Sequence, residues 1–207
     1  MKKVFSVEEI KEIETQEFKK RKGNSFSLMV DAGTNCGKKI AKLIQKKPVI
    51  VIAGHGNNGG DGFIIAEYLR KNNFKVEVYC LNERFYKGDA VKAIKRLKLK
   101  PKNISKFKTS KNSVLIDCLF GTGLNRPIVG KLKSVIFRMK KASKIISIDI
   151  SSGINGNTGK VLGCAVKAHT TLALHAKKIG HTLNPGKRYS GKIIVVDIGI
   201  SKKFNYS

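Results

Sequence analysis

The first 46 residues place apolar side chains at helical spacing, which predicts two helices. Ser6 and Glu9 match the capping-box pattern S-x-x-E, so the first helix should begin near Val7. We expect it to end before Gly23, because glycine is a poor continuation of a helix. Its apolar side is formed by Ile10, Ile13 and Phe18.

The second helix is predicted over residues 27–46. Gly33 and Gly37 lie inside it, four positions apart. Residues at this spacing share one face of a helix, so another backbone can pack closely against them. We interpret the two helices as an extension of the region that follows.

After Pro48, short apolar runs alternate with helical patterns. Strands are predicted at residues 49–53, 75–81, 114–116, 145–150, 170–174 and 193–198. Helices are predicted up to residue 71, over 89–98 and over 128–139, and residues 101–111 are predicted to form a polar surface loop. Apolar strands separated by helices indicate an α/β fold with a mostly parallel sheet covered on both faces.

The segment between the first of these strands and its helix is rich in glycine. From Gly54 it follows the pattern G-x-G-x-x-G, which is the fingerprint of dinucleotide-binding loops. Glycine lets the backbone approach a ligand, and the free N–H groups at a helix start bind anions. The same pattern also suits a plain tight turn. A plain turn does not need two adjacent amides and a carboxylate, so a ligand site is favoured by Asn57, Asn58 and Asp61.

Polar residues follow two other predicted strands. Asp117 ends the third strand, and Asp149 ends the fourth, shortly before Ser152. An aspartate at a strand end commonly caps a turn. In parallel sheets, however, ligands bind outside the carboxyl ends of the strands, so these groups should lie near Asn58. Their oxygens suit a hard cation, and the few charges favour a monovalent ion.

Composition narrows the class of partner. The 207 residues are enough for one sizeable domain. Lysine and arginine number 42 against 14 aspartates and glutamates, a net charge of +28 that attracts phosphate-bearing ligands. Because the lysines are spread along the whole chain, without an arginine-rich arm or an aromatic-basic motif, specific nucleic-acid binding is not predicted.

Cysteine and histidine spacing argues against a zinc site or a redox dithiol. The cysteines at positions 36, 80, 118 and 164 form no C-x-x-C pair and are predicted to be buried in a reducing compartment. His169, His175 and His181 match no metal-binding spacing. The chain shows neither the apolar core of a signal peptide nor an apolar run of 18 residues, so we expect a soluble cytoplasmic protein.

Three motifs at the strand ends make the chain resemble the YjeF N-terminal family, the NAD(P)H-hydrate epimerases. They are Gly54-His55-Gly56-Asn57-Asn58-Gly59-Gly60-Asp61-Gly62, Asp117-Cys118-Leu119-Phe120-Gly121-Thr122-Gly123-Leu124-x-Arg126-Pro127, and Asp149-Ile150-x-Ser152-Gly153 followed by Thr158-Gly159. Weaker similarity occurs at Leu28-Met29-x-x-Ala32-Gly33, Lys178-x-Gly180 and Asp197-Ile198-Gly199-Ile200. The resemblance covers about residues 5–200.

The resemblance implies a Rossmann-like three-layer α/β/α sandwich, one domain over residues 1–207 and a homodimer. It implies repair of damaged nicotinamide cofactors. Water adds to the ring of NADH or NADPH, which gives the hydrates NADHX and NADPHX in R and S forms. The family interconverts these forms, so that a dehydratase can act on the S form. The chain would need this dehydratase as a separate partner.

The resemblance also implies roles for single residues. Lys178 matches a family lysine that would orient the substrate or relay a proton, with a structural salt bridge as its alternative role. From its place at a strand end facing the crevice, Asp149 is our candidate for the carboxylate that takes and returns a proton. Asn58, Asp117 and Ser152 would bind one potassium ion per subunit. The hydrate would be bound by Asn57, Asn58, Gly59, Gly60, Asp61, Gly121, Thr122, Gly123, Leu124, Asn125, Arg126, Pro127 and Asp149.

The chain departs from the family pattern outside the central loops. Val30 stands where glutamate is common, and Ser151, Lys177 and Ile179 stand where prolines are common. Two other functions compete with the epimerase. An NAD-dependent oxidoreductase would need a ribose-binding acid after the second strand. Only Asn82-Glu83 lies there, and no set of hydride-transfer residues accompanies it. A non-catalytic nucleotide- or RNA-binding module on the same fold remains the alternative.

Overall fold

A seven-stranded parallel sheet forms the centre of the computed structural model, which describes residues 4–109 and 111–200. The order across the sheet is β4-β3-β2-β5-β6-β7-β9. This confirms the predicted α/β class with a parallel sheet. The strands are β2 (Val49–Ala53), β3 (Val76–Cys80), β4 (Lys102–Asn103), β5 (Val114–Cys118), β6 (Lys144–Ile148), β7 (Thr170–Leu174) and β9 (Lys192–Val196).

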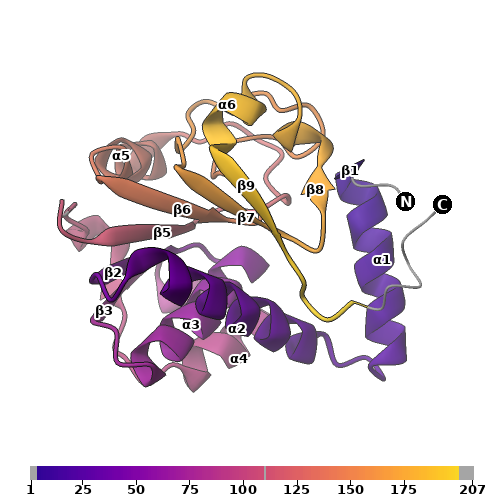
Figure 1. Ribbon diagram of the computed structural model, residues 1–207, viewed down its shortest axis with the longest axis horizontal. Helices are drawn as coiled ribbons and strands as arrows, with labels where there is room; N and C mark the ends of the chain where they lie inside the picture. The colour runs from indigo at the N-terminus through magenta and orange to yellow at the C-terminus, as the bar shows by residue number, and fades with distance from the viewer. Residues whose placement is uncertain (1–3, 110, 201–207) are drawn as a thin grey trace.

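Helices cover both faces of this sheet (Figure 1). Helices α2 (Ser25–Ile44), α3 (Asn57–Lys71) and α4 (Asp89–Arg96) pack on one face, and α5 (Gly130–Met139) packs on the other. Alternate side chains of β2 serve the two faces, because Val51 joins the apolar cluster of the first layer and Ile52 that of the second. Central strands buried on both faces explain the continuous apolar runs in the sequence.

The small residues of α2 allow it to lie close to α3. A Cβ atom added at Gly33 would stand 2.5 Å from Cβ of Ile64, and one added at Gly37 would stand 2.5 Å from the ring of Tyr68. Either contact is far below a normal van der Waals separation. The predicted close packing at these two glycines is therefore confirmed, and α3 is the partner.

The N-terminal helix α1 (Val7–Lys20) stands at the side of the sheet, beside β8 (Lys177–Lys178) in Figure 1. Its predicted capping box is present, because Ser6 Oγ accepts from the N–H of Glu9 at 3.1 Å and the N–H of Ser6 donates to Glu9 at 2.7 Å. The strand β1 (Val4–Phe5), which the sequence pattern did not predict, pairs in parallel with β8. This pairing joins the start of the chain to a segment more than 170 positions away.

Several predicted boundaries were wrong in ways that matter for the site. Asp117 lies within β5, and Asp149 follows β6 with a positive φ of 66°. Residues 101–109 are not simply a polar surface loop. They form β4 and the 3₁₀ turn η2 (Ile104–Lys106), and they bury Ile104 and Phe107 against the sheet.

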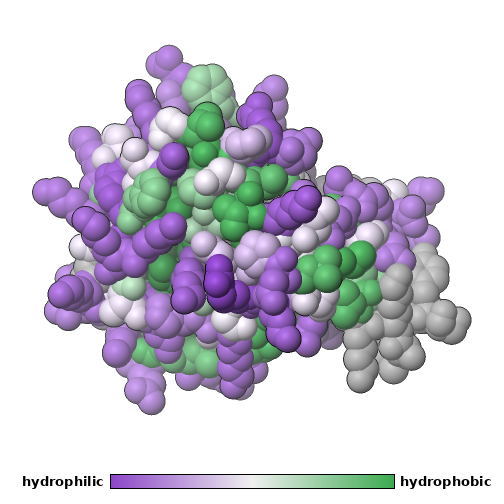
Figure 2. Space-filling view, turned by 90° about the horizontal axis from the view of Figure 1, so that it is seen from above, coloured by the Kyte–Doolittle hydropathy of each residue, from purple (hydrophilic) through white to green (hydrophobic). Residues whose placement is uncertain are grey.

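Other short elements were not predicted at all. They are η1 (Glu83–Phe85), η3 (Ile179–His181) and α6 (Gly186–Ser190). Each is too short to show a periodic pattern of apolar residues in the sequence. The predicted burial of the four cysteines is confirmed, and all four are free thiols. Within residues 4–109 and 111–200, no helix is both long and apolar enough to cross a membrane. Figure 2 shows one face of the molecule, on which hydrophilic side chains dominate and apolar ones form small patches.

Candidate functional site

The glycine-rich motif forms a very short connection between β2 and α3. Strand β2 ends at Ala53 and α3 begins at Asn57, so the rest of the predicted loop is the first part of the helix. A Cβ atom at Gly59 would overlap the carbonyl oxygen of Gly54, and one at Gly54 would overlap the carbonyl oxygen of Leu119. These glycines are therefore required by the close approach of backbone segments.

Asp117 is a fully buried carboxylate that holds neighbouring loops together. Its Oδ2 accepts from Ser147 Oγ at 2.7 Å and from the N–H of Ser152 at 3.0 Å, and its Oδ1 accepts from Ser152 Oγ at 2.6 Å and from the N–H of Leu119 at 3.3 Å. Ser152 Oγ also accepts from the N–H of Phe120 at 2.9 Å. Burial raises the pKa of Asp117, although its hydrogen bonds oppose the rise.

Asp149 forms a buried ion pair with Lys178. The Nζ of Lys178 lies 2.5 Å from Oδ1 of Asp149 and donates to the carbonyl oxygen of Leu174 at 2.8 Å. The second carboxylate oxygen of Asp149 accepts from the N–H of Thr122 at 3.1 Å. Burial opposes the charge of Asp149, but the ammonium of Lys178 keeps the pKa of Asp149 below its ordinary value. The carboxylate is thus ionised and aimed by groups from two other segments.

His181 lies beside this pair. Its Nδ1 accepts from the N–H of Lys178 at 3.0 Å, while its buried Nε2 has no partner among the described residues. Burial and the charge of Lys178 lower the pKa of His181 to about 4, so that its ring is neutral at pH 7. Of His169, His175 and His181, only His181 is hydrogen-bonded to Lys178 among the described residues.

Asn58 is a buried amide that the protein leaves unsatisfied. Neither Oδ1 nor Nδ2 has a hydrogen-bond partner among the described residues. A Cβ atom built at Gly121 would lie 3.2 Å from Cβ of Asn58 and 3.0 Å from Oδ2 of Asp149, so the three residues are neighbours. An unpaired buried amide is energetically unfavourable, and its presence in a fold points to a missing ligand.

The segment 121–127 lies in irregular structure after β5 and is partly exposed. The N–H of Thr122 is taken by Asp149, the N–H of Leu124 donates to Gly121 at 3.3 Å, and Pro127 has no N–H. No hydrogen bond within the described chain uses the N–H groups of Gly123, Asn125 and Arg126. Only part of the predicted phosphate-binding backbone is therefore available to a ligand.

A cavity of about 210 Å³ opens between α1, α2 and α3. Asn57 and Asp61 from the glycine-rich motif line it, and burial, then the charge of Asp149, raises the pKa of Asp61 well above its ordinary value. Sequence reasoning missed Glu14, which also lines this cavity. The helical spacing of the sequence could have revealed Glu14. It stands four residues after Ile10 and four before Phe18, which places its carboxyl group on the apolar side of α1.

The structure brings most of the predicted residues to one edge of the sheet. Asn58, Gly121 and Asp149 adjoin one another, and Asp117 of β5 is hydrogen-bonded to Ser152 in the segment after β6. No group of three His, Cys, Asp or Glu side chains suited to a metal ion occurs within residues 4–109 and 111–200. The amide of Asn58 is without a partner among the described residues, whereas the oxygens of Asp117 and Ser152 take part in hydrogen bonds. These three residues carry a single formal charge, and their oxygen chemistry is compatible with a monovalent cation.

Comparison with known proteins gives consistent results. Residues 25–180 match the family model described as YjeF-related protein N-terminus. A protein of Lentilactobacillus buchneri named NAD(P)H-hydrate epimerase is 34% identical over 206 residues, with 97% of this chain and 96% of that protein covered. A bifunctional NAD(P)H-hydrate repair enzyme Nnr of Thermofilum pendens is 33% identical and covers 93% of this chain, which spans 39% of that longer protein.

The fold also matches a solved structure. The crystal structure of the yeast protein ynu0, YNL200c, has a TM-score of 0.77 and 20% sequence identity, with 100% of this chain and 95% of that one covered. At this identity the likeness supports the arrangement of the sheet and its helices. It confirms the predicted Rossmann-like three-layer architecture.

Proposed function

The chain belongs to the YjeF-related N-terminal family, and from this premise we propose that it is an NAD(P)H-hydrate epimerase, an isomerase that interconverts the R and S forms of NADHX and NADPHX. The observation that carries the proposal is the buried ion pair between Asp149 and Lys178, next to the unsatisfied amide of Asn58. The relative from Lentilactobacillus buchneri named NAD(P)H-hydrate epimerase, which matches over 96% of its length, supports the same activity.

Inversion at a ring carbon that bears a hydroxyl group needs a group that takes and returns a proton. Asp149 suits this role because it is ionised, lies in a site shielded from water and is held at both oxygens. Lys178 balances its charge and fixes its orientation. The positive φ of Asp149 is a strained backbone state for a residue other than glycine, and such strain clusters at functional sites.

We assign the hydrate to the groups that face this pair. Asn57, Asn58, Gly59, Gly60 and Asp61 at the start of α3 would contact the nicotinamide side, together with Asp149. The free N–H groups of Gly123, Asn125 and Arg126 would bind the phosphates, with the remaining residues of segment 121–127 shaping that loop. The high positive charge of the chain favours approach of a dinucleotide phosphate.

We assign a potassium ion to Asn58, Asp117 and Ser152. Their amide, carboxylate and hydroxyl oxygens suit a hard cation, and the orphaned amide of Asn58 would gain a partner. A bound cation would supply positive charge for electrostatic stabilisation at the carboxyl edge of the sheet. Asp117 and Ser152 would keep their loops in place by their hydrogen bonds.

We further propose a cytoplasmic homodimer that works with a separate NAD(P)H-hydrate dehydratase. The bifunctional repair enzyme of Thermofilum pendens contains a region similar to this chain within a longer protein. This arrangement supports a link to a second repair activity. Light scattering after size exclusion would measure the oligomeric state.

The test is an NMR or chromatographic assay of R-to-S conversion of NADHX in potassium buffer. Wild type should exceed the spontaneous rate, and Asp149→Asn should lower the rate by about 10²–10⁴-fold, because it removes a positioned proton-transfer group. Glu12→Gln, on the exposed face of α1, is the matched control and should keep the wild-type rate. Replacing potassium by sodium should lower the rate if the cation assignment holds.

A folded wild type without conversion would overturn the proposal. Wild-type conversion that survives in Asp149→Asn would retain the epimerase and reject the assignment of Asp149.

A further inference from the structure

Glu14 brings a carboxyl group from α1 into the cavity that holds Asn57 and Asp61. Apolar side chains, among them Phe18 and Met29, also line this cavity. Its volume of about 210 Å³ is below the roughly 300–1,000 Å³ of pockets that enclose whole drug-sized ligands. The cavity is therefore suited to a single ring of a dinucleotide, with the phosphates outside it.

The carboxyl groups in the cavity differ in their partners. Asp89 accepts a hydrogen bond from Ser25 and pairs with Lys92 at 2.8 Å. Glu14 and Asp61 receive no hydrogen bond or ion pair from the residues that the structure describes. Two carboxyl groups without protein partners therefore face the same small space, where a bound ring could reach them.

The charges around Glu14 come from several elements. Burial, then the negative charge of Asp149, raises the pKa of Glu14 to about 7, while Lys178 on β8 and Lys11 on α1 itself oppose the rise. Asp61 on α3 also senses Glu14, which raises the pKa of Asp61 further. Near neutral pH, Glu14 can both donate and accept a proton, which is the property of an efficient acid–base group.

Helix α1 is fixed at its start, so Glu14 is held over the cavity. Strand β1 pairs with β8, and this pairing places Phe5 opposite Lys178. The N–H of Val7 donates to Asn157 Oδ1 at 2.7 Å, and Asn157 donates to Glu8 at 2.8 Å. The start of α1 is therefore attached to the segment that carries the partner of Asp149.

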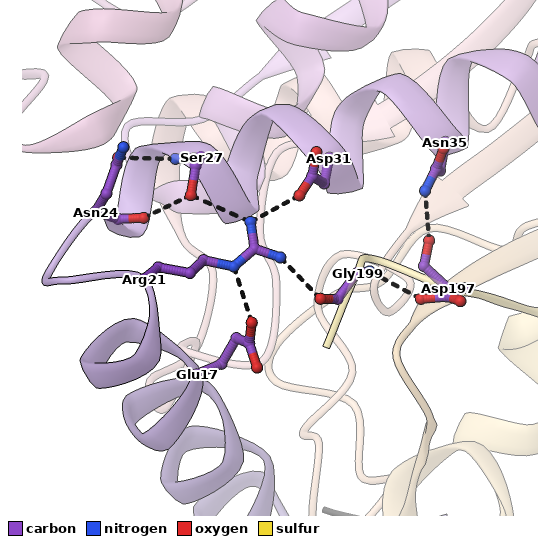
Figure 3. A network of polar contacts seen from close by, with 8 residues as sticks. All are labelled: Glu17, Arg21, Asn24, Ser27, Asp31, Asn35, Asp197 and Gly199. Carbon is purple, nitrogen blue, oxygen red and sulfur yellow. Dashed lines mark hydrogen bonds and ion pairs between the residues drawn. The ribbon is translucent and has the colours of Figure 1, made fainter. Parts of the chain in front are cut away.

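The end of α1 is fixed by Arg21, as Figure 3 shows. The guanidinium donates to Glu17 at 3.0 Å, to Asp31 on α2 at 2.7 Å and to the carbonyl oxygen of Gly199 at 2.8 Å. It thus joins α1, α2 and the segment after β9. Both ends of the helix that carries Glu14 are tied to other parts of the fold.

We propose that Glu14 is a second proton-transfer residue of the epimerisation, supplied by α1 to the ring in this cavity and working with Asp149. This inference rests on the proposed function. Neither the family motifs nor the strand-end pattern include Glu14. The charge of Asp149 acts on both Glu14 and Asp61, so the three carboxyl groups belong to one region, which Glu14 enters from α1 and Asp149 from the end of β6.

Two proton-transfer groups would accelerate this chemistry. The inverted carbon bears a hydroxyl group and the ring nitrogen, whose lone pair can expel the hydroxyl. Protonated Glu14 gives its proton to the departing oxygen, the C–O bond breaks, and the ring nitrogen forms a C=N bond as water leaves. Water then adds to the opposite face and gives its proton to ionised Asp149. Proton exchange with solvent restores both carboxyl groups.

The test compares Glu14→Gln with Glu12→Gln in the R-to-S assay between pH 5 and 9. Glu14→Gln should lower kcat by about 100-fold or more and change KM little, because it keeps the shape but cannot transfer the proton. In the wild type, the rate should change with pH around an apparent pKa of about 7, the pKa of Glu14. This pH dependence should be absent in Glu14→Gln. Glu12→Gln should match wild type in rate and pH profile.

Glu14→Asp keeps the carboxyl group on a shorter side chain and should retain part of the rate and the pH dependence. It is the deciding variant if Glu14→Gln does not fold. Wild-type activity together with an unchanged rate and pH profile in Glu14→Gln would overturn the inference while leaving the epimerase in place. An inactive wild type would instead overturn the proposed function.

Discussion

Polar side chains in and around the site differ in how far the protein satisfies them. Asp117 receives four hydrogen bonds, from Ser147, Ser152 and Leu119. Asn58 has none among the described residues, and neither has the carboxyl group of Glu14. Polar groups satisfied by the protein stabilise the loops, and those left open are where a ligand can supply the partners.

The presence or absence of hydrogen-bond partners distinguishes residues with a structural role from residues with a functional role, although both kinds lie in the same sequence motifs. Asp117 and Asn58 both belong to the implied potassium set, yet only Asn58 is left without a partner. Substitution of the satisfied group should mainly affect stability. Substitution of an open group should affect ligand binding or chemistry and leave stability unchanged or improved.

The largest effect on stability is expected for Asp117→Ala. Four buried donors lose their acceptor, and each unsatisfied buried group destabilises by about 1–3 kcal/mol, so a loss of more than about 3 kcal/mol is expected after relaxation. Urea unfolding measures it. Asp197→Ala, at an exposed carboxylate that accepts from the N–H of Gly199, is the control and should lose less than about 1 kcal/mol. Similar losses in both variants would remove the distinction between the two groups.

A smaller effect, with a defined pH dependence, is expected for Glu14→Gln. The folded state holds the proton of Glu14 up to a pKa of about 7, whereas the unfolded chain releases it near 4.5. The wild type therefore loses stability as the pH rises between these values, by roughly 3 kcal/mol at most, because the unfolded state binds fewer protons there. The variant has no such loss.

Unfolding curves at pH 4 and pH 8 measure this difference. Glu14→Gln should be more stable than wild type at pH 8 and of similar stability at pH 4. An equal difference at both pH values would show that Glu14 titrates normally in the folded protein.

The smallest change in stability is expected for Asn58→Ala. The variant removes an amide without partners, so in sodium buffer its free energy of unfolding should stay within about 1 kcal/mol of wild type. Potassium should raise the melting temperature of wild type and not that of the variant, because a ligand that binds only the folded state stabilises it. A loss of several kcal/mol in sodium buffer would mean that protein groups satisfy Asn58 after all.

Much of the fold followed from patterns that the chain carries locally. Short apolar runs predicted the central strands, period-3.6 spacing of apolar residues predicted most helices, and Ser6 with Glu9 predicted the start of α1. Boundaries failed where tertiary contacts decide them. Asp117 is a strand residue because it lies between neighbours on both sides, with Ile52 on one strand and Ser147 on the other.

The sequence alone determined the class of fold, the glycine-rich connection and the polar residues at three strand ends, because these depend on period, chain stiffness and residue chemistry. Only the tertiary structure decided which of them are satisfied. The pairing of Asp149 with Lys178, the isolation of Asn58 and the position of Glu14 depend on contacts between segments far apart in the chain. No local pattern encodes such contacts, since burial and hydrogen-bond partners arise when the segments pack together.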